Sequence, residues 1–212
     1  MPPLDGASPL ELFWTVMDRG GLLMWPLALL SVTSLALVIE RATFWILLHR
    51  RGGAGRIARL AAALRSGDRP AVEKLLRGDG TIYGRVAARL LDDGASDAVA
   101  IEAVEAQRPR IDRFMGTLST IITAAPMVGI LGTVTGIIRS FQLIGEQSAL
   151  TDPRMVSGGI AEALITTAAG LLIAILTLFP FMIFRAQGER SLGRLEVIIA
   201  AAQEGHAARK RA

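Results

Sequence analysis

Three long uncharged apolar runs constrain the fold of this chain more than any other feature of its sequence. They extend from Gly20 to Ile39, from Phe114 to Ile138 and from Ala163 to Phe184. Each holds about 20 residues or more, the length a helix needs to cross a hydrocarbon core of roughly 30 Å. Backbone groups in lipid must find partners within their own segment, so each run is expected to be helical. The sequence therefore predicts three transmembrane helices.

The remaining parts of the chain are more polar but also have a helical pattern. In residues 49–113, apolar side chains recur at helical spacing, and Gly67, Pro70 and Ser96 stand where helices typically start or end. The tail after residue 184 continues the helical pattern of the third run. We therefore expect an all-α integral membrane protein. It has three transmembrane helices, a helical cytoplasmic domain between the first and second, and a helical cytoplasmic C-terminal extension.

The distribution of basic residues predicts the orientation of these helices. Residues 49–113 carry thirteen Lys and Arg and the tail from Arg185 carries six, whereas the segment before the first run has only Arg19. Cytoplasmic loops are enriched in Lys and Arg, so the middle region and the tail are expected in the cytoplasm. The predicted segments are a periplasmic segment at 1–21, spans at 22–48, 114–144 and 157–184, a cytoplasmic domain at 49–113, a periplasmic connection at 145–156, and a cytoplasmic helix at 185–212.

Composition argues against several classes of function. The chain has no cysteine, and its two histidines, His49 and His206, lie far apart, so we expect no metal site and no cofactor. The spans contain no Ser/His pair, paired aspartates or His-rich motif, so we expect no enzyme. The net charge of +4 comes from basic residues that flank apolar runs. That pattern favours membrane lipid over nucleic acid as a partner.

The N-terminal residues 1–14 contain two acidic residues and no basic ones. A secretory signal peptide begins with a positively charged region, so we do not expect a cleavable signal here. Late in the first run, Glu40 and Arg41 stand next to each other. They could pair locally or extend to the cytoplasmic surface, and we favour a structural role for them.

The second run carries small residues on one face of its expected helix. Ala125, Gly129, Gly132 and Gly136 recur at spacings of three or four residues. Small side chains let membrane helices approach closely, so these four residues are predicted to form a packing surface. The second and third runs also hold several threonines, including Thr133 and Thr167. Most hydroxyls in such helices bond back to their own backbone, but this number in two helices also suits a hydrated interior.

Glu162 is the only charged residue in the stretch "SGGIAEALITTAAGLLIAI". A carboxylate at membrane depth is costly, and such acids commonly face cavities, partners or ion paths. On an ideal helix, Thr166 lies about 40° from Glu162 and Thr167 about 140° away. Glu162 and Thr166 are therefore expected to share a face as a proton relay. The alternative is an interfacial glutamate in the first turn of a helix, stabilised by the helix dipole.

Two motifs give the chain a resemblance to a known family. "APMVGILGTVTGIIRSF" followed by "GGIAEALITTAAGLLIAI" resembles the ExbB/TolQ/MotA proton-channel family, closest to its ExbB and TolQ branch. The first span, with its Glu-Arg pair, is similar to that of the family in a weaker way. By this resemblance Glu162, Thr133 and Thr167 match polar ring residues that face the proton path.

The resemblance also implies partners and a location. Members of the family form an inner-membrane ring, commonly a homopentamer, around two single-span ExbD- or TolR-like helices. An aspartate of the partner is the implied principal proton carrier, and flow drives a TonB- or TolA-like protein that spans the periplasm. The alternative from another class of function is a non-conducting membrane scaffold, in which the glycines only pack and Glu162 is interfacial.

Overall fold

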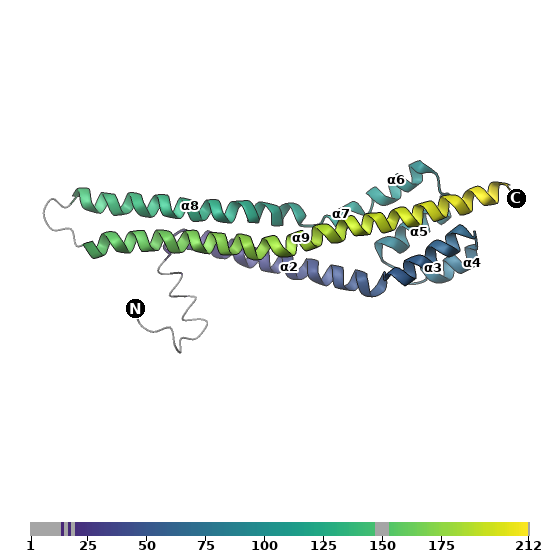
Figure 1. Cartoon of the computed structure of the whole chain (residues 1–212), viewed down its shortest axis with the longest axis horizontal. Coiled ribbons are helices and arrows are strands. Elements are labelled where there is room, and N and C mark those ends of the chain that lie inside the picture. The colour runs from purple at the N-terminus through teal and green to yellow at the C-terminus, as the bar shows by residue number, and fades with distance from the viewer. Residues whose placement is uncertain (1–13, 15–16, 18–19, 147–152, 212) are drawn as a thin grey trace. The chain divides into compact units, whose positions relative to one another are not determined.

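A computed structural model describes residues 14, 17, 20–146 and 153–211, and all of its regular secondary structure is helical (Figure 1). Most of the predicted segment 1–21 and of the predicted connection 145–156 therefore lies outside the described residues. The helices are α2 (Met24–Arg51), α3 (Ala54–Arg65), α4 (Arg69–Leu76), α5 (Ile82–Asp92), α6 (Asp97–Glu105), α7 (Arg108–Ile111), α8 (Met115–Glu146) and α9 (Pro153–Arg211). The described residues contain no strand, which confirms the all-α prediction.

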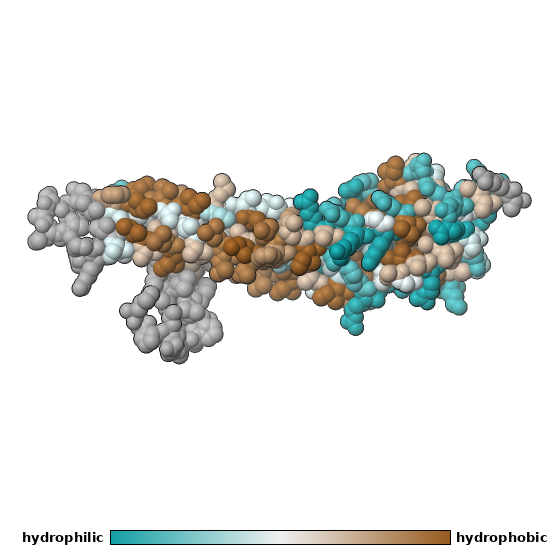
Figure 2. Space-filling view, viewed as in Figure 1, coloured by the Kyte–Doolittle hydropathy of each residue, from teal (hydrophilic) through white to brown (hydrophobic). Residues whose placement is uncertain are grey.

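Three helices are long and apolar enough to cross a membrane. They are α2, α8 and α9, and they contain the three apolar runs, so the prediction of three transmembrane helices is confirmed. Helix α9 has 59 residues, many more than the roughly 20 that a bilayer requires. The predicted third span and the predicted C-terminal extension thus form one continuous helix. Figure 2 shows apolar residues covering α8 and the first part of α9.

The chain divides into two compact units. The first contains Met1–Val38 and Thr117–Phe181, and the second contains Ile39–Gly116 and Met182–Ala212. The first unit thus holds the start of α2, nearly all of α8 and the apolar part of α9. The second unit holds α3 to α7 with the end of α2 and the last part of α9.

In the first unit, the small residues of α8 lie directly against α9. The two helices run antiparallel and side by side (Figure 1). A Cβ added at Gly129 would lie 3.0 Å from the Cα of Thr167, and one at Gly136 would lie 2.7 Å from the Cβ of Ala163. At the other end of the contact, Gly170 of α9 lies against the carbonyl oxygen of the fully buried Ala125. A side chain at any of these glycines would press on the facing helix, so the two helices approach closely here.

The start of α2 completes the first unit through apolar packing and one hydrogen bond. Met17, Met24 and Leu27 form a buried cluster with Ala125 of α8. Further along, the hydroxyl oxygens of Ser34 and Thr177 lie 2.6 Å apart and are buried. Thr177 donates its proton to the carbonyl oxygen of Ile173, so Ser34 must be the donor to Thr177. This hydrogen bond joins α2 to α9. Each of the two hydroxyls donates to an oxygen of the protein, so neither needs a water molecule as acceptor.

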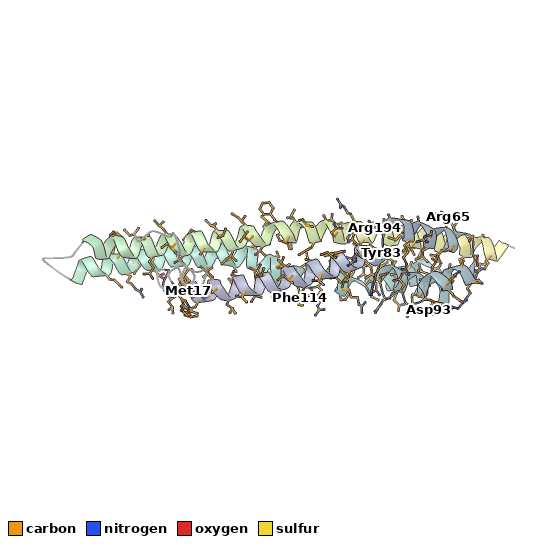
Figure 3. All side chains as sticks on the ribbon, turned by 90° about the horizontal axis from the view of Figure 1, so that it is seen from below. Met17, Arg65, Tyr83, Asp93, Phe114 and Arg194 are labelled. Carbon is orange, nitrogen blue, oxygen red and sulfur yellow. The ribbon has the colours of Figure 1, made fainter. Side chains whose placement is uncertain are left out.

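In the second unit, short helices pack around the last part of α9. Val86 of α5 and Ile198 of α9 are completely buried. The Tyr83 hydroxyl donates to the Oγ of Ser191 at 3.1 Å, and Arg65 pairs with Glu204. Figure 3 labels Tyr83 and Arg65. An apolar core with a few polar contacts therefore holds α3 and α5 against α9.

The predicted helix ends in this unit are confirmed. The chain leaves α3 through Gly67 at φ +70°, a conformation that favours glycine. The side chains of Asp68, Thr81 and Ser96 each accept a hydrogen bond from a backbone N–H in the first turn of α4, α5 and α6. These caps satisfy N–H groups that have no partner within the helix.

Arg41 of α2 joins that helix to the short α7. Its side chain is fully buried, and its Nη1 atom donates to the carbonyl oxygens of Arg110 (3.0 Å), Ile111 (3.2 Å) and Arg113 (3.0 Å). Its Nε atom lies 3.3 Å from Glu40. Of the two expectations for this pair, local pairing is therefore what the structure shows. Arg41 satisfies carbonyl groups at the end of α7 that have no partner within the helix.

We predict that Gly170→Ala destabilises the α8–α9 contact by about 1–3 kcal/mol, because the added methyl overlaps the carbonyl of Ala125. The matched control is Gly193→Ala, in the same helix, where an added Cβ meets open space. Alanine there should be neutral or stabilising by about 0.5–1 kcal/mol. The measurement is the apparent melting temperature of the detergent-solubilised protein, and equal effects of the two changes would contradict the packing described.

A second prediction concerns Arg41→Met, which removes the donor to three carbonyl groups. Each buried group left unsatisfied costs about 1–3 kcal/mol, so the junction at the end of α7 should open. Limited trypsin digestion should then cut faster after Arg110 and Arg113 than in the unchanged protein. Arg50→Met, in the same helix, serves as the control, and cleavage that stays unchanged in Arg41→Met would show that the contact is dispensable.

Candidate functional site

The first unit contains a cavity of about 210 Å³ beside the α8–α9 contact. Its walls come from the start of α2 and from the facing sides of α8 and α9. The lining residues are Gly20, Leu22, Leu23, Leu131, Gly132, Thr135, Gly136, Arg139, Glu162 and Thr166. A cavity of this size with carboxylate, guanidinium and hydroxyl groups in its wall can hold several water molecules. We therefore treat this cavity as the candidate functional site.

Glu162 and Arg139 form the charged part of this wall. The Nη1 atom of Arg139 lies 3.9 Å from the Oε1 atom of Glu162, with side-chain exposures of 70% and 33%. A pair at this distance and exposure is loose, and such pairs contribute about 0–1 kcal/mol in water.

Thr166 is buried beside Glu162. Its hydroxyl lies 3.0 Å from the carbonyl oxygen of Gly20 and 2.9 Å from that of Glu162, and its one proton serves both acceptors. Gly21 adopts φ +64°, and a Cβ there would overlap the carboxylate of Glu162. The backbone that leads into α2 therefore lies directly against the carboxylate, at a residue whose positive φ favours glycine.

The other two predicted pathway residues lie elsewhere in the first unit. The Thr167 hydroxyl donates to the carbonyl oxygen of Gly129 at 2.7 Å, across the α8–α9 contact. The Thr133 hydroxyl donates to Ile130 of its own helix at 2.6 Å. Neither residue lines the cavity. The structure thus brings Glu162 and Thr166 together and leaves Thr133 and Thr167 outside their cavity.

Sequence reasoning missed the roles of Arg139 and Gly21 in this site. Arg139 directly follows the second apolar run, and its pairing with Glu162 depends on the register between α8 and α9. The signal that could have found it is the stripe of small residues. Pairing Gly136 with Ala163 across antiparallel helices brings position 139 close to position 162. The described residues contain no group of three or more His, Asp or Glu side chains placed to hold a metal ion.

Comparison with known proteins identifies the family. Residues 81–197 match the profile of the MotA/TolQ/ExbB proton channel family, and this range includes all of the cavity residues of α8 and α9. The chain belongs to this family. Its membership confirms the resemblance seen in the two motifs, and it makes the chain a multi-pass membrane protein of the ExbB and TolQ type.

Similarity to individual members of the MotA/TolQ/ExbB family extends over most of the chain. A Synechocystis protein named as a biopolymer transport protein, ExbB-like 3, is 36% identical, with 79% of this chain and 82% of that protein covered. The biopolymer transport protein exbB1 of Vibrio cholerae is 28% identical, with 88% and 85% covered. The Tol-Pal system protein TolQ of Pseudomonas aeruginosa is 28% identical, with 85% and 86% covered.

We predict that Gly21→Ala destabilises the protein by about 1–2 kcal/mol, mainly because alanine is strained at the positive φ of this residue. The added Cβ also forces the end of the Glu162 side chain to move. A double-mutant cycle with Glu162→Ala isolates that smaller part, because the collision disappears with the carboxylate. The coupling should be about 0.5–1 kcal/mol, measured from apparent melting temperatures of the four proteins. Additive effects of the two changes would show that the backbone does not approach the carboxylate.

Proposed function

We propose that this chain is the ring-forming, proton-conducting subunit of an inner-membrane motor of the ExbB–ExbD or TolQ–TolR type. The observation that carries the proposal is Glu162, a partly buried carboxylate in a membrane helix that lines a cavity together with Thr166 and Arg139. Membership of a proton channel family supports the same conclusion. In this proposal the motor converts proton-motive force into mechanical work.

The geometry around Glu162 suits a group that exchanges protons. The carboxylate lies 3.9 Å from Arg139, too far for a tight ion pair. In this proposal a proton reaches the carboxylate through water in the cavity. Each charge that crosses the membrane yields about 2.3 kcal/mol per 100 mV. The passage of a few protons can therefore drive a change in helix packing.

Thr133 and Thr167 belong to the proposed path at the level of the assembled ring. Both lie outside the cavity of the single chain, so their contribution requires a surface completed by other chains. The Thr133 hydroxyl donates to its own helix, which leaves the oxygen lone pairs free to accept a hydrogen bond. We propose that these hydroxyls face the central helices of a partner.

The names of the relatives are the basis for the proposed partners. These relatives are named for biopolymer transport and for the Tol-Pal system. By analogy, the chain assembles as a homo-oligomer of five copies around an ExbD- or TolR-like single-span protein. The motor then acts on a TonB- or TolA-like protein to support energised transport or envelope maintenance. Residues 49–113 and the C-terminal tail face the cytoplasm, and the N-terminus faces the periplasm.

We predict that Glu162→Gln lowers proton flux about 100-fold, because a positioned proton-transfer group contributes about that factor or more. Thr133→Val should give a smaller decrease. The assay reconstitutes the chain with its ExbD-like partner in liposomes, imposes a membrane potential and follows internal pH with a dye. Thr123→Val is the matched control, because the Thr123 hydroxyl is exposed on the same helix and donates to its own backbone.

The same experiment distinguishes the motor from a non-conducting scaffold. A scaffold predicts unchanged flux in Glu162→Gln and Thr133→Val, and a cellular function that persists in the presence of an uncoupler. If both variants retain the flux of the unchanged protein, the assigned path is wrong.

A further inference from the structure

The second unit contains a cavity that the proposed proton path does not use. It has a volume of about 130 Å³ and lies beside the last two turns of α2. One wall is apolar and includes Phe44 and Leu47 of α2. The rest comes from Thr81 and its neighbours at the start of α5 and from two arginines, Arg51 and Arg110.

The charged part of this cavity is positive and lacks an internal counter-ion. Arg51 and Arg110 are both exposed, and within the described residues neither side chain has an ion pair or a hydrogen bond. The carboxylate nearest in sequence to the α5 wall is Asp79, and it is already engaged. It lies 3.2 Å from Arg56 and accepts a hydrogen bond from the Thr81 N–H at 2.9 Å. Two guanidinium groups therefore remain available to an anion.

The apolar wall indicates which kind of anion fits. The last turn of α2 carries His49, Arg50 and Arg51, so the apolar part of the helix ends there. Leu47 and Phe44 lie about 6 and 10 Å further along the helix axis from Arg51, on the apolar side. Half of the Leu47 surface is exposed. A ligand in this cavity thus meets positive charge at one end and hydrocarbon at the other.

We propose that this cavity binds the phosphate group of an anionic phospholipid such as phosphatidylglycerol. Guanidinium groups bind phosphate oxygens in a bidentate manner, and Arg51 and Arg110 approach the cavity from two different helices. The first acyl carbons of the lipid lie along Leu47 and Phe44. Basic pockets at the ends of transmembrane helices are known to recognise anionic head groups in this way.

This inference goes beyond the proposed proton conduction and does not depend on it. The lipid site uses no residue of the Glu162 cavity. A lipid held between α2, α5 and α7 would also strengthen the contact that Arg41 makes with α7.

The test uses the full-length chain in nanodiscs that contain a phosphatidylglycerol with a photoreactive group near the head-group end of one acyl chain. After illumination, peptide mass spectrometry locates the label. We expect label on the end of α2. In Arg51→Gln/Arg110→Gln, half-maximal labelling there should need about 30-fold more lipid, the equivalent of about 2 kcal/mol for two arginines. Arg50→Gln/Arg77→Gln, which removes two arginines outside the cavity, should label as the unchanged protein does.

Further arms separate the lipid from other anions. Arg51→Lys/Arg110→Lys keeps the charge and should recover part of the labelling. A phosphatidylcholine probe with the same photoreactive chain should label the end of α2 weakly. Equal labelling by the two lipids, or no loss in Arg51→Gln/Arg110→Gln, would overturn the proposal. Competition by inorganic phosphate at millimolar concentration would also overturn it, because the site would then bind a free anion without need of a lipid chain.

Discussion

The close contact between the backbones of α8 and α9 is the constraint on which the candidate site depends. In lipid, the hydrophobic effect does not bring helices together, so association depends on van der Waals packing and on hydrogen bonds between helices. Glycines on α8 provide both. At Gly129 the missing side chain lets the helices touch, and it also exposes the carbonyl oxygen to the hydroxyl of Thr167. A larger residue would remove the contact and the hydrogen bond together.

This contact also fixes the register that assembles the polar cavity. With Gly136 against Ala163, the next turn of α8 brings Arg139 towards Glu162. The chain before α2 then closes one side, where the carbonyl of Gly20 accepts from Thr166. Two segments that are distant in sequence, α8 and the chain before α2, thus supply the carboxylate with a cation and a backbone wall. Thr166, from the same helix as Glu162, lines the same cavity. The site is a product of packing and not of a local motif alone.

The sequence was sufficient for features that depend on local patterns. Apolar length predicts the three spans. Pro70 and Ser96 mark helix starts, because proline fits the first turn of a helix and the serine side chain caps a nearby N–H group. Contacts between distant segments could not be predicted. Apolar periodicity shows which face of a helix is buried, but it does not show which other helix packs against that face. Arg41 bonds carbonyl groups about 70 residues away. The proposed roles of Thr133 and Thr167 involve further chains, and for that reason they remain predictions.

Arg41 and Glu162 show two ways in which this chain accommodates a charge within an apolar helix. Arg41 is fully buried and is held by three carbonyl oxygens, so no single change in its surroundings releases it. Glu162 is one-third exposed, and its one ion-pair partner within the described residues lies 3.9 Å away. Arg41 therefore holds α2 against the end of α7. Glu162 has one distant ion-pair partner and a place in the cavity wall, and this weaker hold is what the proposed proton path requires of it.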